Sequence, residues 1–88
     1  MDYERLIHSL IDDIVDDPKS VLIRVSEGNT PKDILIIIAS EKNDTARLIG
    51  HKGIIANSLR EVVSVAGKSE NKRIHLKFES FDEEKVEG

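Results

Sequence analysis

The sequence predicts one small α+β domain, in which a three-stranded sheet is covered by helices on one face. A chain of 88 residues has room for a single hydrophobic core. Its apolar residues recur with helical spacing, then with strand spacing in two segments, then again with helical and finally with strand spacing. The expected order is therefore α-β-β-α-α-β. Residues 1–81 are expected to form the domain and residues 82–88 an acidic C-terminal tail.

The first element is an amphipathic helix, expected over residues 2–16. Pro18 is expected to end it, because the residue before a proline is pushed out of the helical conformation. The apolar side chains recur at steps of three and four residues and define one buried face: Tyr3, Leu6, Ile7, Leu10, Ile11, Ile14 and Val15.

Two strands are expected next, joined as an antiparallel hairpin. In residues 21–26 apolar and polar side chains mostly alternate, which is the period of a strand. Residues 27–32 contain Gly, Asn and Pro, which are typical of a turn. Residues 34–39 are unbroken aliphatic residues, so they predict a central strand, or one whose second face meets a ligand or partner. The short connection favours the hairpin.

Two helices and a third strand complete the predicted order. Asn43-Asp44-Thr45 is expected to cap a short helix over residues 45–49. A longer helix is expected over residues 54–66, with Gly67 as its C-cap. Its predicted buried face consists of Ile55, Leu59, Val62, Val63 and Ala66. The final strand is indicated by alternation between residues 74 and 79.

Composition excludes several classes of function. The net charge is −4, but the acidic excess lies at the two ends, and residues 18–81 carry 11 basic against 7 acidic side chains. A local basic surface is therefore compatible with the negative net charge of the whole protein. The absence of cysteine excludes disulfides, thiolate metal sites and cysteine nucleophiles. The acidic N-terminus does not resemble a signal peptide, and the longest apolar run is far short of a membrane span, so a cytoplasmic location without membrane association is expected.

The segment Leu-Ile-Gly-His-Lys-Gly-Ile-Ile-Ala, residues 48–56, resembles the signature of KH domains. The element order is similar to their type II arrangement, and the likeness extends from Tyr3 to Glu79. It is most similar to small bacterial RNA-binding proteins that consist of a single KH domain. Those typically read Ile-Gly-Lys-Gln-Gly-Arg-Ile-Ala here and have Glu-Asn-Lys-Arg before the final strand, as residues 70–73 do. The resemblance implies a type II KH fold over residues 1–81.

The chemistry of the loop suits a nucleic-acid backbone. Gly50 and Gly53 remove side chains where a sugar-phosphate chain must approach the main chain. A helix is expected to begin directly after Gly53, and its unsatisfied N–H groups form an anion site. His51 and Lys52 add a hydrogen-bond donor and a positive charge. In KH domains such a loop clamps about four nucleotides of single-stranded RNA.

The resemblance also implies the remainder of the RNA site. An apolar groove would be lined by Ile49, Ile55 and the outward residues of the strand over residues 34–39. Polar contacts would come from Arg47, Asn57 and Arg60. The aromatic content of 3% fits this mode and counts against RNA-binding folds that stack bases on aromatic side chains. The family's role implies a function in RNA metabolism, such as that of an RNA chaperone.

Two departures from the family pattern favour a second interpretation. His51-Lys52 replaces a lysine-glutamine pair, and Ile54 replaces an arginine after the second glycine. Weaker and more pH-dependent RNA binding is therefore expected. An isoleucine at position 54 favours contact with protein over contact with phosphate. The alternative function is thus a dimerisation or interaction module, which pairs with itself through Ile54 or with a larger KH-containing protein of the Jag type.

No enzymatic or metal-binding pattern is found. Gly67-Lys68-Ser69 lacks the earlier glycine of a phosphate-binding P-loop and is expected to close a helix rather than open one. The three histidines do not have metal-ligand spacing, and the aspartates at positions 12–17 do not follow a calcium loop. The serines have no paired general base. The sequence therefore predicts a protein that is not an enzyme and has no cofactor.

Overall fold

The structure, a computed structural model, describes residues 1–81, so the predicted acidic tail lies outside the described residues. The elements follow the expected α-β-β-α-α-β order, which is the type II KH order. Two short 3-10 turns, Pro18–Ser20 and His51–Gly53, complete the chain. The helices are α1 (Tyr3–Ile11), α2 (Lys42–Ile49) and α3 (Ile54–Lys68), and the strands are β1 (Leu22–Glu27), β2 (Asp33–Ser40) and β3 (Arg73–Ser80).

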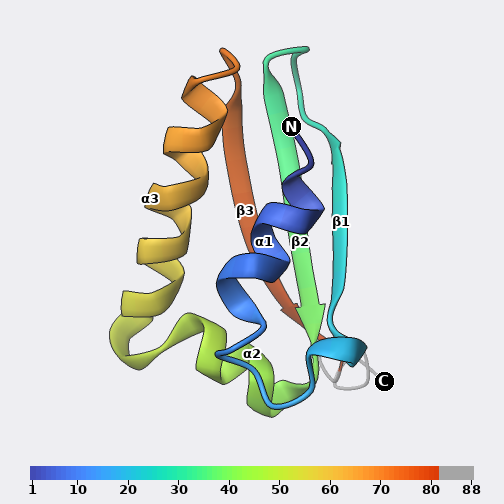
Figure 1. Cartoon of the computed structure of the whole chain (residues 1–88), viewed down its shortest axis with the longest axis vertical. Helices are drawn as coiled ribbons and strands as arrows, with labels where there is room; N and C mark the ends of the chain where they lie inside the picture. The colour runs from blue at the N-terminus through green and yellow to red at the C-terminus, as the bar shows by residue number, and fades with distance from the viewer. Residues whose placement is uncertain (82–88) are drawn as a thin grey trace.

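The three strands form one mixed sheet in the order β1-β2-β3. β1 and β2 are antiparallel, which confirms the predicted hairpin, and β2 and β3 are parallel. β2 is therefore the central strand, as its unbroken aliphatic run predicted. α1 lies over the sheet and α3 runs beside β3 along the length of the molecule (Figure 1). The helices lie on one face of the sheet, and within residues 1–81 no helix covers the other, which we call the open face (Figure 1).

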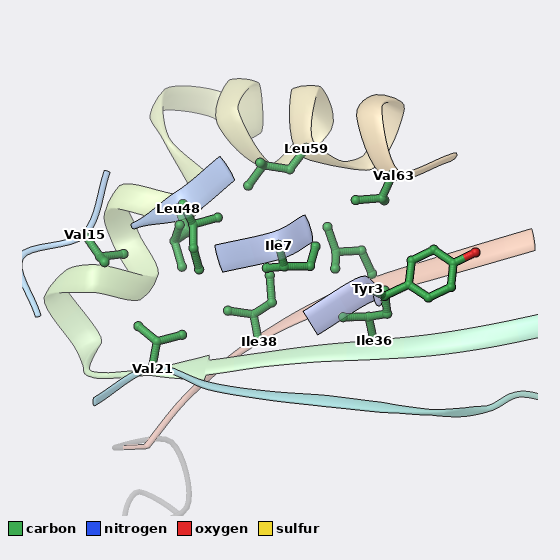
Figure 2. Close-up of a cluster of buried hydrophobic side chains, with 11 residues drawn as sticks. Tyr3, Ile7, Val15, Val21, Ile36, Ile38, Leu48, Leu59 and Val63 are labelled. Carbon is green, nitrogen blue, oxygen red and sulfur yellow. The ribbon is translucent and has the colours of Figure 1, made fainter. Parts of the chain in front are cut away.

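The core lies between that covered face and the helices. Ile36 and Ile38 point up from β2, Leu59 and Val63 point down from α3, and Ile7 of α1 lies between them (Figure 2). Alternation along β2 places Leu35, Ile37 and Ala39 on the open face, because their neighbours Ile36 and Ile38 are fully buried.

The first helix ends earlier than predicted, at Ile11 rather than at residue 16. The N–H groups of Ile14 and Val15 both donate to the carbonyl of Ile11, so the chain turns and still buries Val15. The Asp44 carboxylate then accepts hydrogen bonds from the backbone N–H groups of Asp16 and Asp17, at 2.8 and 3.1 Å. These bonds satisfy two backbone N–H groups that have no helical partner. Because their acceptor is distant in the sequence, local periodicity does not reveal them.

The predicted cap of the second helix is wrong. α2 begins at Lys42, and its N-cap, Glu41, makes no side-chain capping bond. Asp44 lies in the first turn and is buried, because its carboxylate binds the segment after α1 instead. The buried Thr45 hydroxyl is 2.7 Å from the Ser40 hydroxyl and donates toward the Glu79 carbonyl at 3.2 Å. Both side chains therefore join distant segments rather than capping their own helix.

The third helix is longer than predicted, and Gly67 is not its C-cap. Gly67 lies inside α3 and is buried against β3, where an added Cβ would stand 2.6 Å from Ile74 Cγ1. Val62 was predicted to be buried but is 45% exposed. The buried face follows the spacing Ala56, Leu59, Val63 and Gly67, and Val62 lies about 100° away from Val63 around the helix. Within residues 1–81, no helix has the length and apolar character needed to cross a membrane.

Candidate nucleic-acid interface

The loop of residues 50–53 has an unusual backbone. Gly50, Lys52 and Gly53 have φ values of 75°, 56° and 78°. Gly50 also has ψ of 176°, a region that is essentially restricted to glycine. The Gly50 N–H closes α2 by donating to the Ala46 carbonyl at 2.9 Å, and the Gly53 N–H donates to the Gly50 carbonyl at 3.1 Å. The loop is therefore a defined, hydrogen-bonded turn between α2 and α3.

Lys52 is a non-glycine residue with a left-handed backbone, which costs about 1 kcal/mol relative to a right-handed one. Such strain is characteristic of functional sites. The side chains of His51 and Lys52 are both exposed. The turn therefore presents a ring donor and an ammonium group to solvent at its apex.

The loop leads directly into α3, and its last residue, Gly53, is the N-cap of that helix. A glycine has no side chain to cap the first N–H groups, and no side-chain capping bond is present here. The helix is 15 residues long, so the positive end of its dipole also lies at the loop. Backbone donors, dipole and Lys52 together make this end of α3 favourable for an anion.

Asn57 and Arg60 lie on the face of α3 that is turned toward β3. Arg60 Nη1 donates to Asn57 Oδ1 at 3.3 Å, and Arg60 Nε donates to the Leu76 carbonyl of β3 at 3.3 Å. The Arg60 guanidinium also lies 5.5 Å from the centre of the Phe78 ring. Arg60 therefore links α3 to β3, and it contacts Asn57 on the same face of the helix.

Arg47 is on α2 and is engaged by two carboxylates. Its guanidinium is 3.2 Å from Asp44 Oδ1 and 3.2 Å from Asp16 Oδ2. The pKa of Asp44 is lowered, first by the backbone N–H of Asp16 and further by the N–H of Asp17 and by Arg47, so Asp44 is charged near neutral pH. Arg47 therefore stands at the joint between α2 and the segment after α1, with part of its charge neutralised.

The apolar residues predicted near the loop occupy different environments. Ile55 is partly buried against the core, whereas Ile49 and Ile54 are 38% and 64% exposed. The prediction that outward residues of the central strand line the same groove is wrong. Those residues face away from the helices, and the strand beside α3 is β3 (Figure 1).

One group of residues did not emerge from sequence reasoning. Four basic side chains gather at the end of α3 remote from the loop, with Asn71 among them: Lys32, Lys68, Lys72 and Arg73. They come from three segments, so only the fold brings them together. Within the described part of the chain, no set of three or more His, Cys, Asp and Glu side chains could hold a metal ion.

Comparisons with known proteins find relatives in one family. Residues 4–78 match the family model described as KhpA/KhpB, KH domain. The chain is 34% identical over 75 residues to the RNA-binding protein KhpA of Listeria monocytogenes, a match that covers 85% of this chain and 96% of that protein.

Two further relatives are similar over comparable lengths. Identity to the RNA-binding protein KhpA of Bacillus subtilis is 34% over 79 residues, which is 90% of this chain and 93% of the relative. Identity to the protein of the same name from Borreliella burgdorferi is 26% over 73 residues, 83% and 87% of the two chains. No solved structure matches the chain significantly.

Proposed function

Because the chain belongs to the KhpA/KhpB family of KH domains, we propose that it binds single-stranded RNA through the loop of residues 50–53. KH domains are binding modules and not enzymes. The observation that carries the proposal is the backbone of the loop, in which three of four residues have positive φ directly before an uncapped 15-residue helix. Such a turn brings the main chain close to a phosphate without intervening side chains.

The proposed contacts divide by their chemistry. The RNA backbone would lie against Gly50, His51, Lys52 and Gly53, with Lys52 as the charged contact. The bases would lie toward β3, where Asn57 and Arg60 offer donors. Ile49 and Ile55, on the two sides of the loop, would offer apolar surface. A single domain of this size contacts few nucleotides, so we expect modest affinity and loose sequence preference.

Arg47 has a smaller part in this proposal. Its ion pairs with Asp44 and Asp16 would have to be shared or broken before it met a phosphate. Asp16 is the more exposed partner, so that pair is the weaker one. Arg47 would therefore contribute less to RNA affinity than Lys52 does.

The proposal is tested by reversing the charge of the loop. The double variant His51→Asp with Lys52→Asp should lower the affinity for a short single-stranded RNA by at least about tenfold, because it places two carboxylates where the phosphate would lie. The matched control is Lys42→Asp with Asn43→Asp, an equal change of charge at exposed positions in the first turn of α2. Equal affinity of the loop variant and the control would remove the loop from the mechanism.

A second function, self-association, is favoured by the outer face of α3. Ile54, Val62 and Val65 are 64%, 45% and 69% exposed, and they lie on one side of the helix with Ser58 between them. We infer that two copies pack through this face in an antiparallel arrangement. Ile54 of one copy would then meet Val65 of the other, and the small Ser58 would permit close approach at the centre.

Antiparallel packing also suits the charges on α3. It places Glu61 of one copy near the uncharged Ser58 of the other, whose hydroxyl donates to the Ile54 carbonyl of its own helix, and it separates the two Lys52 side chains. A larger KH-containing protein of the Jag type is the other occupant of this face that the family resemblance suggests. We further propose a cytoplasmic role in RNA metabolism, such as that of an RNA chaperone.

A further inference from the structure

A basic cluster lies at the opposite end of α3 from the loop. Four basic side chains and Asn71 line a surface depression of about 450 Å³, and the four are Lys32, Lys68, Lys72 and Arg73. They come from the β1–β2 connection, the last turn of α3 and the start of β3. These segments meet at the end of the molecule where α3 turns into β3 (Figure 1).

The cluster is held in place by hydrogen bonds between its segments. Lys72 Nζ donates to the Pro31 carbonyl at 2.8 Å, and the Arg73 N–H donates to the Lys32 carbonyl at 2.8 Å. These bonds fix the α3–β3 turn to the hairpin. The Lys72 side chain and the backbone at Lys32 and Arg73 are therefore in place before any ligand arrives, which lowers part of the entropic cost of binding.

The acidic groups nearby are already paired. Asp33 is bound by Arg73 at 2.9 Å, and Glu70 is bound by the N-terminal amino group at 2.8 Å and by the Tyr3 hydroxyl at 2.8 Å. Lys32 and Lys68 are exposed, and neither forms an ion pair within residues 1–81. The cluster therefore offers two lysines with open positions for an anion.

A polar edge of α3 connects the loop to this cluster. Asn57, Arg60, Ser64 and Lys68 follow at steps of three, four and four residues, so they share one face of the helix. A second hollow, of about 430 Å³, lies along this part of α3 and is lined by Arg60, Glu61, Ser64, Val65 and Lys68. Glu61 is its single acidic residue. Val65 forms the side of this hollow that borders the face proposed for self-association, so an RNA strand would follow the side formed by Arg60, Ser64 and Lys68. The 15 residues of α3 span about 22 Å between the loop and the cluster.

We propose that a bound RNA strand continues beyond the nucleotides held by the loop, along this edge of α3, and that the basic cluster binds one of its later phosphates. This inference rests on the proposed RNA-binding function. When the loop holds one part of an RNA strand, the effective concentration of the rest of that strand at the basic cluster rises. A longer RNA should therefore bind more tightly than either contact alone would allow. Lys32 and Lys68 are the residues that would meet the phosphate.

The test compares oligouridines of four and ten nucleotides by amide NMR titration and fluorescence anisotropy. In the wild-type protein the decamer should shift the amides of the cluster as well as those of the loop, whereas the tetramer should shift the loop alone. The variant Lys32→Glu with Lys68→Glu should lower decamer affinity by about tenfold and leave tetramer affinity within about twofold. The dependence of log affinity on log salt should become shallower by about 0.7 for each phosphate that the variant no longer neutralises.

The matched control is Lys19→Glu with Lys42→Glu, an identical change of charge at exposed lysines outside the cluster. An equal loss of decamer affinity in this control would overturn the inference, because the effect would then come from net charge alone. Unchanged decamer binding by the cluster variant would also overturn it while leaving the loop as a site. Failure of the wild-type protein to bind either oligonucleotide would instead refute the proposed function itself. Lys32→Gln with Lys68→Gln provides a milder pair if the reversal unfolds the domain.

Discussion

Gly50 lies so close to Ile55 that no side chain fits between them, since a Cβ added to Gly50 would stand 2.7 Å from Ile55 Cγ1 and 3.1 Å from the Ile55 backbone nitrogen. The start of the loop is therefore packed directly on the first turn of α3. The second glycine differs. An added Cβ on Gly53 would meet only Asn57 Nδ2, at 3.9 Å. Gly50 is required by contact and by its dihedral angles, and Gly53 by its dihedral angles alone.

This difference predicts unequal costs for the two alanine substitutions. Gly53→Ala should lower the free energy of unfolding by about 1 kcal/mol, the cost of a left-handed non-glycine residue. Gly50→Ala adds overpacking, which typically costs a further 1–3 kcal/mol, and should shift Ile55 and the loop with it. Urea denaturation of both variants measures the difference. Equal losses at the two positions would show that Ile55 yields easily and does not fix the loop.

Sequence patterns predicted the element order and the central strand because those depend on local periodicity. The unbroken aliphatic run of residues 34–39 forms the central strand β2, as predicted. Gly67 was misread because a glycine near a helix end resembles a C-cap, whereas its actual role depends on Ile74, seven residues away on another element. Lys32 and Lys68 meet only through the fold, so no local signal could join them.

Gly67 supplies a prediction that runs against helix propensity. Alanine is the better helix former by about 1 kcal/mol, yet at this position its methyl group would stand 2.6 Å from Ile74 Cγ1 and 2.9 Å from the Lys72 carbonyl oxygen. We therefore expect Gly67→Ala to lower the free energy of unfolding by about 1–3 kcal/mol. Thermal unfolding followed by circular dichroism measures it. Ser64→Ala on the same helix is the control and should be nearly neutral, and a stabilised Gly67→Ala protein would contradict the tight contact.

If two copies pack through the outer face of α3, one charge added to that face should weaken self-association. Ile54→Glu places a carboxylate in the proposed contact and should shift the protein toward monomer in sedimentation equilibrium at several concentrations. Leu22→Glu is the matched control, because Leu22 is 63% exposed but lies at the start of β1, away from α3. A wild-type protein that is monomeric at all concentrations would refute the homodimer. Assembly only in the presence of a larger KH-containing protein would assign the face to that partner instead.

Asp33 predicts the dependence of stability on pH. Its carboxylate accepts hydrogen bonds from the Thr30 hydroxyl at 2.9 Å and from Arg73 Nε at 2.9 Å, and it lies 3.2 Å from His75 Nε2. The hydrogen bond with His75, then that with Thr30 and the charge of Arg73, lower the pKa of Asp33 from 3.8 to about 2, against the opposing effect of burial. The folded state therefore binds fewer protons at this site than the unfolded state does.

The sign follows from linkage. A carboxyl with a lower pKa in the folded state stabilises the fold fully above the unfolded value, and that contribution is lost as the pH falls from about 4 to about 2. Asparagine resembles the protonated carboxyl, so Asp33→Asn should be less stable than wild type at pH 6, and the difference should shrink below pH 4. Urea denaturation at pH 6, 4 and 3 measures it. Asp13→Asn, at an exposed position, is the control and should give no such trend. If the difference in stability between wild type and Asp33→Asn stays constant down to pH 3, Asp33 acts through its shape rather than its charge.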